Sequence, residues 1–185
     1  MDAYGPSFGD DLAAFADGAI GKGLSPQVEA LIAQAGRLRH MPHQALPLLE
    51  SARAAAPRHP APLIALYRFH FYGHQLEQAR AVGVDALAVA RTALGPDFGD
   101  EPPSFEAARF DAAVRFYLFT LKGLAYLNLR LGEFEEARVL LAELRRLDPQ
   151  DHAGAALLAQ VLARHEAGGE TGLDYPVRGW SAALP

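Results

Sequence analysis

Two histidines, His70 and His74, have the four-residue spacing that places side chains on one face of a helix and that many metal sites use. Gly73 lies between them and favours the end of a helix there. No Glu follows His70 as the zinc-protease motif requires, and the sequence shows no third ligand. We therefore expect no metal ion and no cofactor, and interpret both histidines as part of a helix end.

Adjacent carboxylates, which could act together as general acid and base, occur at Asp10-Asp11 and Glu135-Glu136. The second pair stands at the expected start of a helix, where the helix dipole stabilises negative charge. The glycine-rich segment 18–23 lacks the spacing of a phosphate-binding loop, which needs four residues between its glycines and Ser or Thr after its Lys. No set of residues predicts catalysis, so we expect that the protein is not an enzyme.

The composition is that of a folded protein. The chain has 185 residues, of which 50% are hydrophobic and 21% charged, enough for one well-buried domain. It contains no cysteine, which excludes disulfide frameworks, thiolate nucleophiles and zinc–thiolate sites. The N-terminal residues are acidic and interrupted by Gly and Pro, unlike a signal peptide. These features favour a cytoplasmic protein.

The charges indicate which partners to expect. The formal net charge is −5, and the basic residues are scattered except for Arg145-Arg146, so we expect no nucleic-acid partner. The longest apolar stretch, 116–131, is interrupted by Lys122 and Arg130 and is too short to span a bilayer. We expect no membrane insertion, and the oligomeric state stays open.

An internal repeat organises the rest of the chain. A helix with Ala137 on its apolar face ends at Pro149, and an earlier one with Ala45 ends at Pro57, with the same twelve-residue interval in both. A third Ala, Ala79, follows a glycine-containing turn like the one at Gly132. Repeating units bury their apolar faces against neighbours of the same shape, so the pattern predicts stacked helical hairpins.

The expected elements follow from caps, breaks and helical spacing of apolar residues. An N-terminal arm or cap covers 1–23, with one short helix at 10–19. Helices are expected from Ser25, at 43–56 and 62–72, from the turn at 73–79 to 94, at 104–130, at 134–147 and at 152–167. An acidic loop occupies 95–103, and a tail at 168–185, with Tyr175 and Trp180, is expected to cover the end of the stack.

The stretch 118–149 resembles a tetratricopeptide repeat (TPR). The residues that carry the resemblance are Leu121, Leu124-Ala125, Ala137, Leu141 and Pro149, with Gly132 and Phe134 at the turn. Ala79 lies 34 residues after Ala45, which is the period of this repeat class. Asn128 departs from the pattern, which usually has Tyr there. The resemblance implies an all-α fold, a right-handed superhelix of about three helical hairpins over 24–167 with a C-terminal capping helix.

The resemblance also implies a protein-binding module or scaffold. Family members hold a peptide or helix of a partner on a concave face lined by the first helix of each hairpin. The positions of this chain that match that face are Gln34, Arg37, Tyr67, His70, Phe71, Lys122, Tyr126, Arg130, Gln160 and Arg164. Binding is expected to centre on the residues from Tyr67 to Phe71 and from Lys122 to Arg130, where aromatic and cationic side chains occur together.

Other functions stay open at this point. One alternative within the same class is a chaperone for a secreted or assembled protein substrate, and another is an enzyme or metal-binding protein that uses a helical scaffold. Family members that clamp the C-terminal carboxylates of chaperone clients use several asparagines, whereas this chain has only Asn128. We expect Asn128 to lie off the inner face and therefore expect no such clamp.

Overall fold

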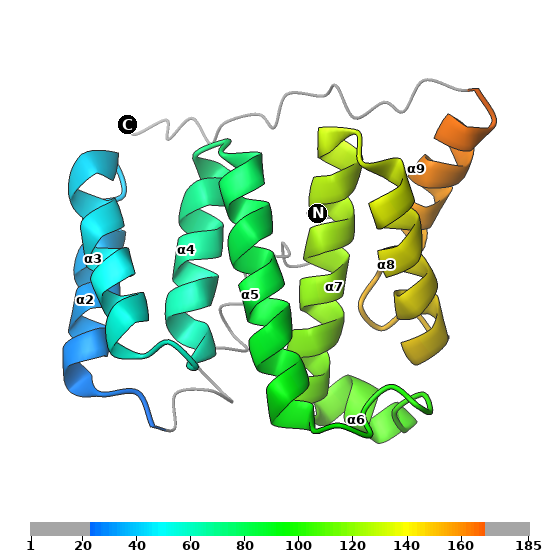
Figure 1. The fold of residues 1–185 in the computed structure, drawn as a ribbon, viewed down its shortest axis with the longest axis horizontal. Coiled ribbons are helices and arrows are strands. Elements are labelled where there is room, and N and C mark those ends of the chain that lie inside the picture. The colour runs from blue at the N-terminus through cyan, green and yellow to red at the C-terminus, as the bar shows by residue number, and fades with distance from the viewer. Residues whose placement is uncertain (1–22, 169–185) are drawn as a thin grey trace, which may run out of the picture.

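The computed structural model describes residues 23–168, and within this range every regular element is a helix, which confirms the expected all-α class (Figure 1). The helices are α2 (Pro26–Arg37), α3 (Pro42–Ala55), α4 (Pro60–Tyr72), α5 (Leu76–Leu94), α6 (Phe105–Phe110), α7 (Ala112–Leu131), α8 (Phe134–Leu147) and α9 (Ala156–Glu166). The expected helix at 10–19, the rest of the N-terminal arm and the tail that carries Trp180 lie outside the described residues.

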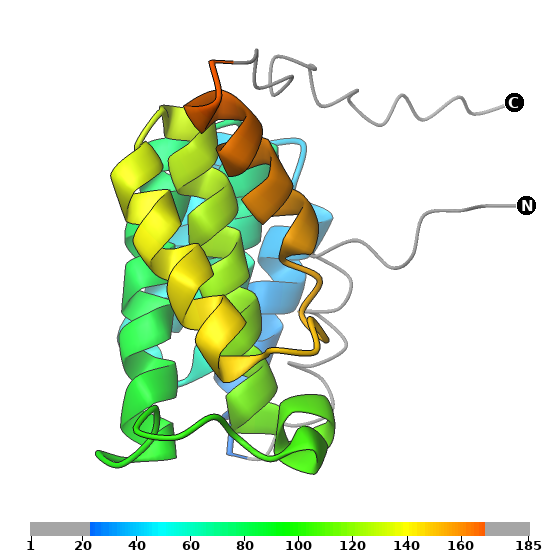
Figure 2. The same cartoon turned by 90° about the vertical axis from the view of Figure 1, so that its right-hand side faces the viewer.

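The helices form three antiparallel pairs, α2 with α3, α4 with α5, and α7 with α8, followed by α9. The first helices of the pairs, together with α9, run parallel to one another in one layer, and α3, α5 and α8 form a second layer (Figures 1 and 2). Packing continues between pairs, because α3 contacts α4, α5 contacts α7 and α8 contacts α9. The short helix α6 packs against α7.

A fully buried alanine occupies the fourth position of each second helix. Ala45 in α3, Ala79 in α5 and Ala137 in α8 all have 0% of their surface exposed. A methyl group at this position allows the two helices of a pair to approach closely, since any larger side chain would fill the space between them. The repeat that is visible in the sequence therefore corresponds to one recurring contact in the structure.

Several helix ends follow the expected caps. The Ser25 hydroxyl accepts a hydrogen bond from the Val28 amide, at 3.3 Å, and begins α2. Gly132 ends α7 in the left-handed conformation, with φ of 80°. Helix α4 ends at Tyr72 with Gly73 as its cap, so the helix stops between His70 and His74 as the sequence indicates.

The expected single helix at 104–130 is wrong, because the chain breaks at Asp111 into α6 and α7. Asp111 has extended backbone angles, φ −75° and ψ 123°. Its carboxylate accepts a hydrogen bond from the Val114 amide at 3.0 Å, which makes it the N-cap of α7. Asp can replace a helical backbone hydrogen bond with its own side chain, and this local competition starts a new helix.

The last helix begins at Ala156, four residues later than expected. Asp151 has a positive φ of 56°, and its carboxylate accepts hydrogen bonds from the Ala155 and Ala156 amides. The buried Asp148 carboxylate accepts from the Ala153 amide at 2.7 Å. These two carboxylates organise residues 148–155 as a turn, and this turn sets the start of α9.

Candidate functional site

Five side chains form a continuous row across the ends of α4 and α7, in the order Arg68, Tyr72, Phe71, Tyr126, Arg130. We call this row the arginine–aromatic strip. Tyr72 is 53% exposed, and the other four side chains are partly exposed. The strip therefore presents aromatic and cationic groups to solvent from two first-layer helices.

The contacts along the strip are close. The Arg68 guanidinium carbon lies 6.0 Å from the Tyr72 ring centre, and the Tyr72 and Phe71 rings meet edge to face at 5.4 Å. The Phe71 and Tyr126 ring centres are 5.8 Å apart, which joins α4 to α7. Arg130 lies 5.9 Å from the Tyr126 ring centre and donates from Nη1 to the Tyr126 hydroxyl oxygen at 2.9 Å. Both arginines are thus held against aromatic rings by cation–π contacts.

Tyr67 lies beneath the strip as part of the core. Its ring stacks on Phe71 at 5.9 Å, and only 7% of the residue is exposed. Burial raises the pKa of the Tyr67 phenol above its usual range, and the neighbouring phenols of Tyr126 and Tyr72 raise it further. Tyr67 therefore supports the aromatic rings at the surface from beneath, whereas the sequence predicts it on the binding surface itself.

Lys122 has a defined structural contact. Its ammonium group donates a hydrogen bond to the Ala153 carbonyl oxygen at 2.7 Å and thereby ties α7 to the turn before α9. Lys122 lies one helical turn before Tyr126, so it shares a face of α7 with the strip. The charge is nevertheless engaged by the protein's own backbone.

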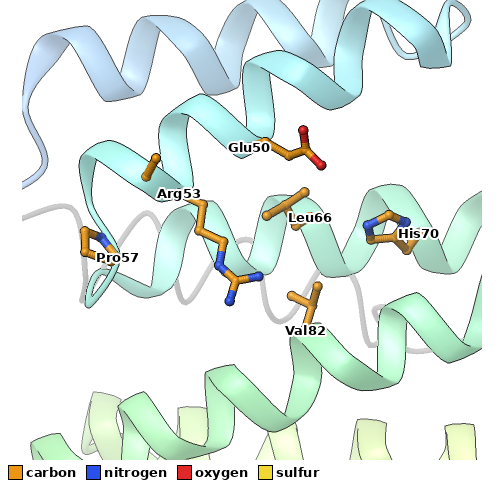
Figure 3. A pocket seen from close by; sticks show the side chains of 7 residues that line it. Glu50, Arg53, Pro57, Leu66, His70 and Val82 are labelled. Carbon is orange, nitrogen blue, oxygen red and sulfur yellow. The ribbon is translucent and has the colours of Figure 1, made fainter.

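His70 belongs to a different surface from the strip. It lines a pocket of about 300 Å³ between α3, α4 and α5, together with Glu50, Arg53, Ala54, Pro57, Leu66 and Val82 (Figure 3). His70 is 9% exposed, and its Nδ1 pairs with the Gln75 side-chain oxygen at 2.7 Å. The Arg53 guanidinium pairs with the Asp85 carboxylate at 2.5 Å. His70 thus lies on a different face of α4 from Tyr67 and Phe71.

The remaining expected site residues are exposed on the outer first-layer helices. Gln34 and Arg37 lie on α2, and Gln160 and Arg164 lie on α9. The helices that carry them, α2 and α9, lie on the two sides of α4 and α7 (Figure 1). Within residues 23–168, no hydrogen bond or ion pair joins these four side chains to the strip, so they lie apart from it on either side.

The two layers differ in charge. The helices of the first layer carry two acidic residues, Glu29 and Glu166, and six basic ones, Arg37, Arg68, Arg115, Lys122, Arg130 and Arg164. The helices α3, α5 and α8 carry equal numbers of both, with Glu50, Glu77, Asp85, Glu135, Glu136 and Glu143 against Arg53, Arg80, Arg91, Arg138, Arg145 and Arg146. A chain of net charge −5 therefore concentrates positive charge on the layer that holds the strip.

Two members of the strip, Arg68 and Tyr72, are missing from the residues expected from the sequence. They are four residues apart on α4, and this spacing places a guanidinium over an aromatic ring on one helix face. That spacing is the signal that could have identified them. Asn128, by contrast, is buried and lies off the strip. Its side-chain oxygen accepts a hydrogen bond from Arg80, and its side-chain nitrogen donates to the Leu124 carbonyl oxygen.

Within residues 23–168, no group of three or more His, Cys, Asp or Glu side chains is arranged to hold a metal ion. In the same range, none of the helices combines the length and apolarity needed to cross a membrane.

One curated relative places the chain in a family. The chain is 38% identical over 126 residues to an uncharacterized 19.8 kDa protein in the nifW 5′ region of Azotobacter chroococcum mcd 1. The match covers 65% of this chain and 70% of the relative. The chain belongs to the same family as that protein. No protein-family model matches the chain, and no solved structure matches it significantly.

Proposed function

We propose that this protein is a TPR-like binding module that holds an acidic segment of another protein on its first-layer helices, with the arginine–aromatic strip as the centre of the contact. The single observation that carries the proposal is the strip itself. It joins two arginines and three aromatic side chains in one exposed row across two helices.

The chemistry of the strip favours an acidic partner. Tyr and Arg dominate the binding energy of many protein interfaces, because they offer large contact area and strong charge-assisted hydrogen bonds. Arginine in particular matches the geometry of carboxylates. The positive balance of the first layer also steers acidic partners toward this face. These properties support a carboxylate-bearing peptide or helix as the bound element.

The proposal is tested by capture from the native cell extract on three immobilised forms of the full chain. The forms are the wild type, the strip variant Arg68→Glu with Arg130→Glu, and a control variant Arg58→Glu with Arg145→Glu. Arg58 and Arg145 are exposed and lie off the strip, so the control reverses the same amount of charge elsewhere.

The proposal is supported by a protein that the wild type and the control retain and the strip variant does not. Salt should weaken the binding of that protein. Circular dichroism and melting temperature establish that the strip variant is folded. If all three forms retain the same proteins equally, the strip is not the binding surface and the proposal is wrong.

A further inference from the structure

The chain carries an acidic segment of its own before the first described helix. Residues 1–22 contain four aspartates and one lysine, with three aromatic residues among them. In order, these residues are Asp2, Tyr4, Phe8, Asp10, Asp11, Phe15, Asp17 and Lys22. This composition has the charge that complements the first layer, and its aromatic residues could contact the rings of the strip.

Arginines of the first layer gather at one end of that layer. Helices α2, α4, α7 and α9 run parallel, so their C-terminal ends share one edge (Figure 1). Arg37, Arg130 and Arg164 stand in the last turns of α2, α7 and α9, and Arg68 is four residues before the end of α4. The edge therefore presents one exposed or partly exposed arginine from each helix.

The segment is long enough to reach the strip. Helix α2 begins at Pro26, at the opposite end of the layer from the arginines (Figure 1). The path covers roughly 20 Å along the helices and about two interhelical spacings of 8–10 Å across them. Asp10 and Asp11 precede Pro26 by about 15 residues, which span up to roughly 50 Å when extended.

We propose that residues 1–22 dock on the arginine–aromatic strip of the same chain and compete there with the partner. The competition with a partner rests on the proposed function, whereas the docking of residues 1–22 on the strip does not require a partner. For a tethered segment with an effective concentration on the order of 1 mM and a dissociation constant on the order of 100 µM, a competitor's affinity falls about tenfold. The docked segment would therefore set a minimum affinity, and only an acidic partner that binds the strip more tightly would displace it.

The absence of cysteine in the chain allows a direct test. The full-length variant Ser7→Cys takes a single nitroxide spin label, and the label should broaden the amide signals of the strip in the NMR spectrum. Two further changes, each made in the labelled chain, should remove the broadening. One is Arg68→Glu with Arg130→Glu. The other changes Asp2, Asp10, Asp11 and Asp17 to Asn, and we call the resulting protein the neutralised-arm chain.

A charge-matched control makes the second comparison specific. Glu77, Glu101, Glu106 and Glu136 are exposed acidic residues elsewhere on the described chain, and changing all four to Gln removes the same charge. This control should leave the broadening in place. Absence of broadening at the strip in the Ser7→Cys chain, or broadening that survives both sets of changes, overturns the proposal. Broadening seen only when labelled chain is mixed with isotope-enriched unlabelled chain also overturns it, because the segment then docks on a second copy.

The affinity measurement uses a synthetic peptide with the sequence of residues 1–22 as the probe. It should bind the neutralised-arm chain about tenfold more tightly than the wild type, since the strip is then vacant. Equal affinities overturn the competition. Together with capture from the extract, these measurements separate the two proposals. If residues 1–22 dock on the strip but no protein from the extract depends on the strip, only the partner proposal is rejected. If a protein from the extract depends on the strip but residues 1–22 do not dock there, only the docking proposal is rejected.

Discussion

Gly83 of α5 faces Leu124 of α7 so closely that a Cβ atom on Gly83 would lie 2.8 Å from Leu124 Cδ2. The same atom would lie 3.3 Å from Leu124 Cγ and 3.6 Å from the Tyr67 ring. The second and third helix pairs therefore meet at a glycine, and the aromatic support of the strip rests against this crossing. A side chain at position 83 would have to displace the side chain of Leu124, which is only 3% exposed.

We predict that Gly83→Val destabilises the protein by about 1–3 kcal/mol through overpacking. Gly36 provides the matched control, because it is also helical and a Cβ there has nothing within 4 Å. Gly36→Val should change the free energy of unfolding by no more than about 0.5 kcal/mol. Urea denaturation of both variants measures the difference, and equal stabilities would show that the crossing of α5 and α7 accommodates a larger side chain without cost.

The buried alanine of α8 gives a second packing prediction. Ala137→Leu should destabilise by about 1–3 kcal/mol, because Ala137 has 0% exposure and occupies the close approach of α7 and α8. Val139→Leu, on the same helix with 68% exposure, is the control and should be nearly neutral. Thermal unfolding followed by circular dichroism compares the two. A neutral Ala137→Leu would contradict the role of this position in the repeat.

Much of the fold could be predicted from the sequence, because its signals are local. Ser25 as a cap and the Gly132 turn each act within a few residues, and the alanines recur at a regular spacing along the chain; the structure has all of these features. The break at Asp111 is also local, but the apolar period continues through it and suggested an unbroken helix. The apolar period indicates which face of a helix is buried. It does not indicate where a side chain accepts a hydrogen bond from a backbone amide and so begins a new helix.

The candidate site was harder to predict, because it depends on which helix faces meet. Tyr67 and Phe71 belong to one face of α4, and His70 turns toward α3 and α5 (Figure 3). Tyr126 joins the first two only because α7 lies beside α4. The contact of Lys122 with the Ala153 carbonyl oxygen spans 31 residues, and no sequence pattern indicates it.

Lys122 is predicted to contribute to stability. Lys122→Met keeps the apolar part of the side chain and removes the hydrogen bond to the Ala153 carbonyl oxygen. A hydrogen bond from a charged donor contributes about 1.5–3 kcal/mol, and partial exposure of Lys122 places the expected loss of unfolding free energy near the lower value. Arg58→Met, at an exposed loop position, is the control and should be neutral within about 0.5 kcal/mol. Denaturant titration measures both, and equal effects would mean that the bond adds nothing.

The raised pKa of Tyr67 predicts a loss of stability in alkali. Burial, with the phenols of Tyr126 and Tyr72, makes the folded-state pKa higher than that of the unfolded chain. The stabilisation is fully present below the unfolded pKa of about 10 and is lost as the pH rises toward the folded value, because only the unfolded state releases the proton. The free energy of unfolding should therefore fall above pH of about 10, with a slope of up to about 1.4 kcal/mol per pH unit from this group.

Tyr67→Phe removes the titrating group and keeps the ring that stacks on Phe71. The variant should lose stability less steeply than the wild type above pH of about 10, and the two slopes should agree at neutral pH. Tyr72→Phe is the matched control, since it makes the same change at a residue that is 53% exposed. Urea denaturation of the three proteins at a series of pH values measures the slopes. Parallel alkaline slopes for the wild type and Tyr67→Phe would contradict this prediction. They would show that the phenol of Tyr67 ionises as readily in the folded chain as in the unfolded one, so that water reaches Tyr67 beneath the strip.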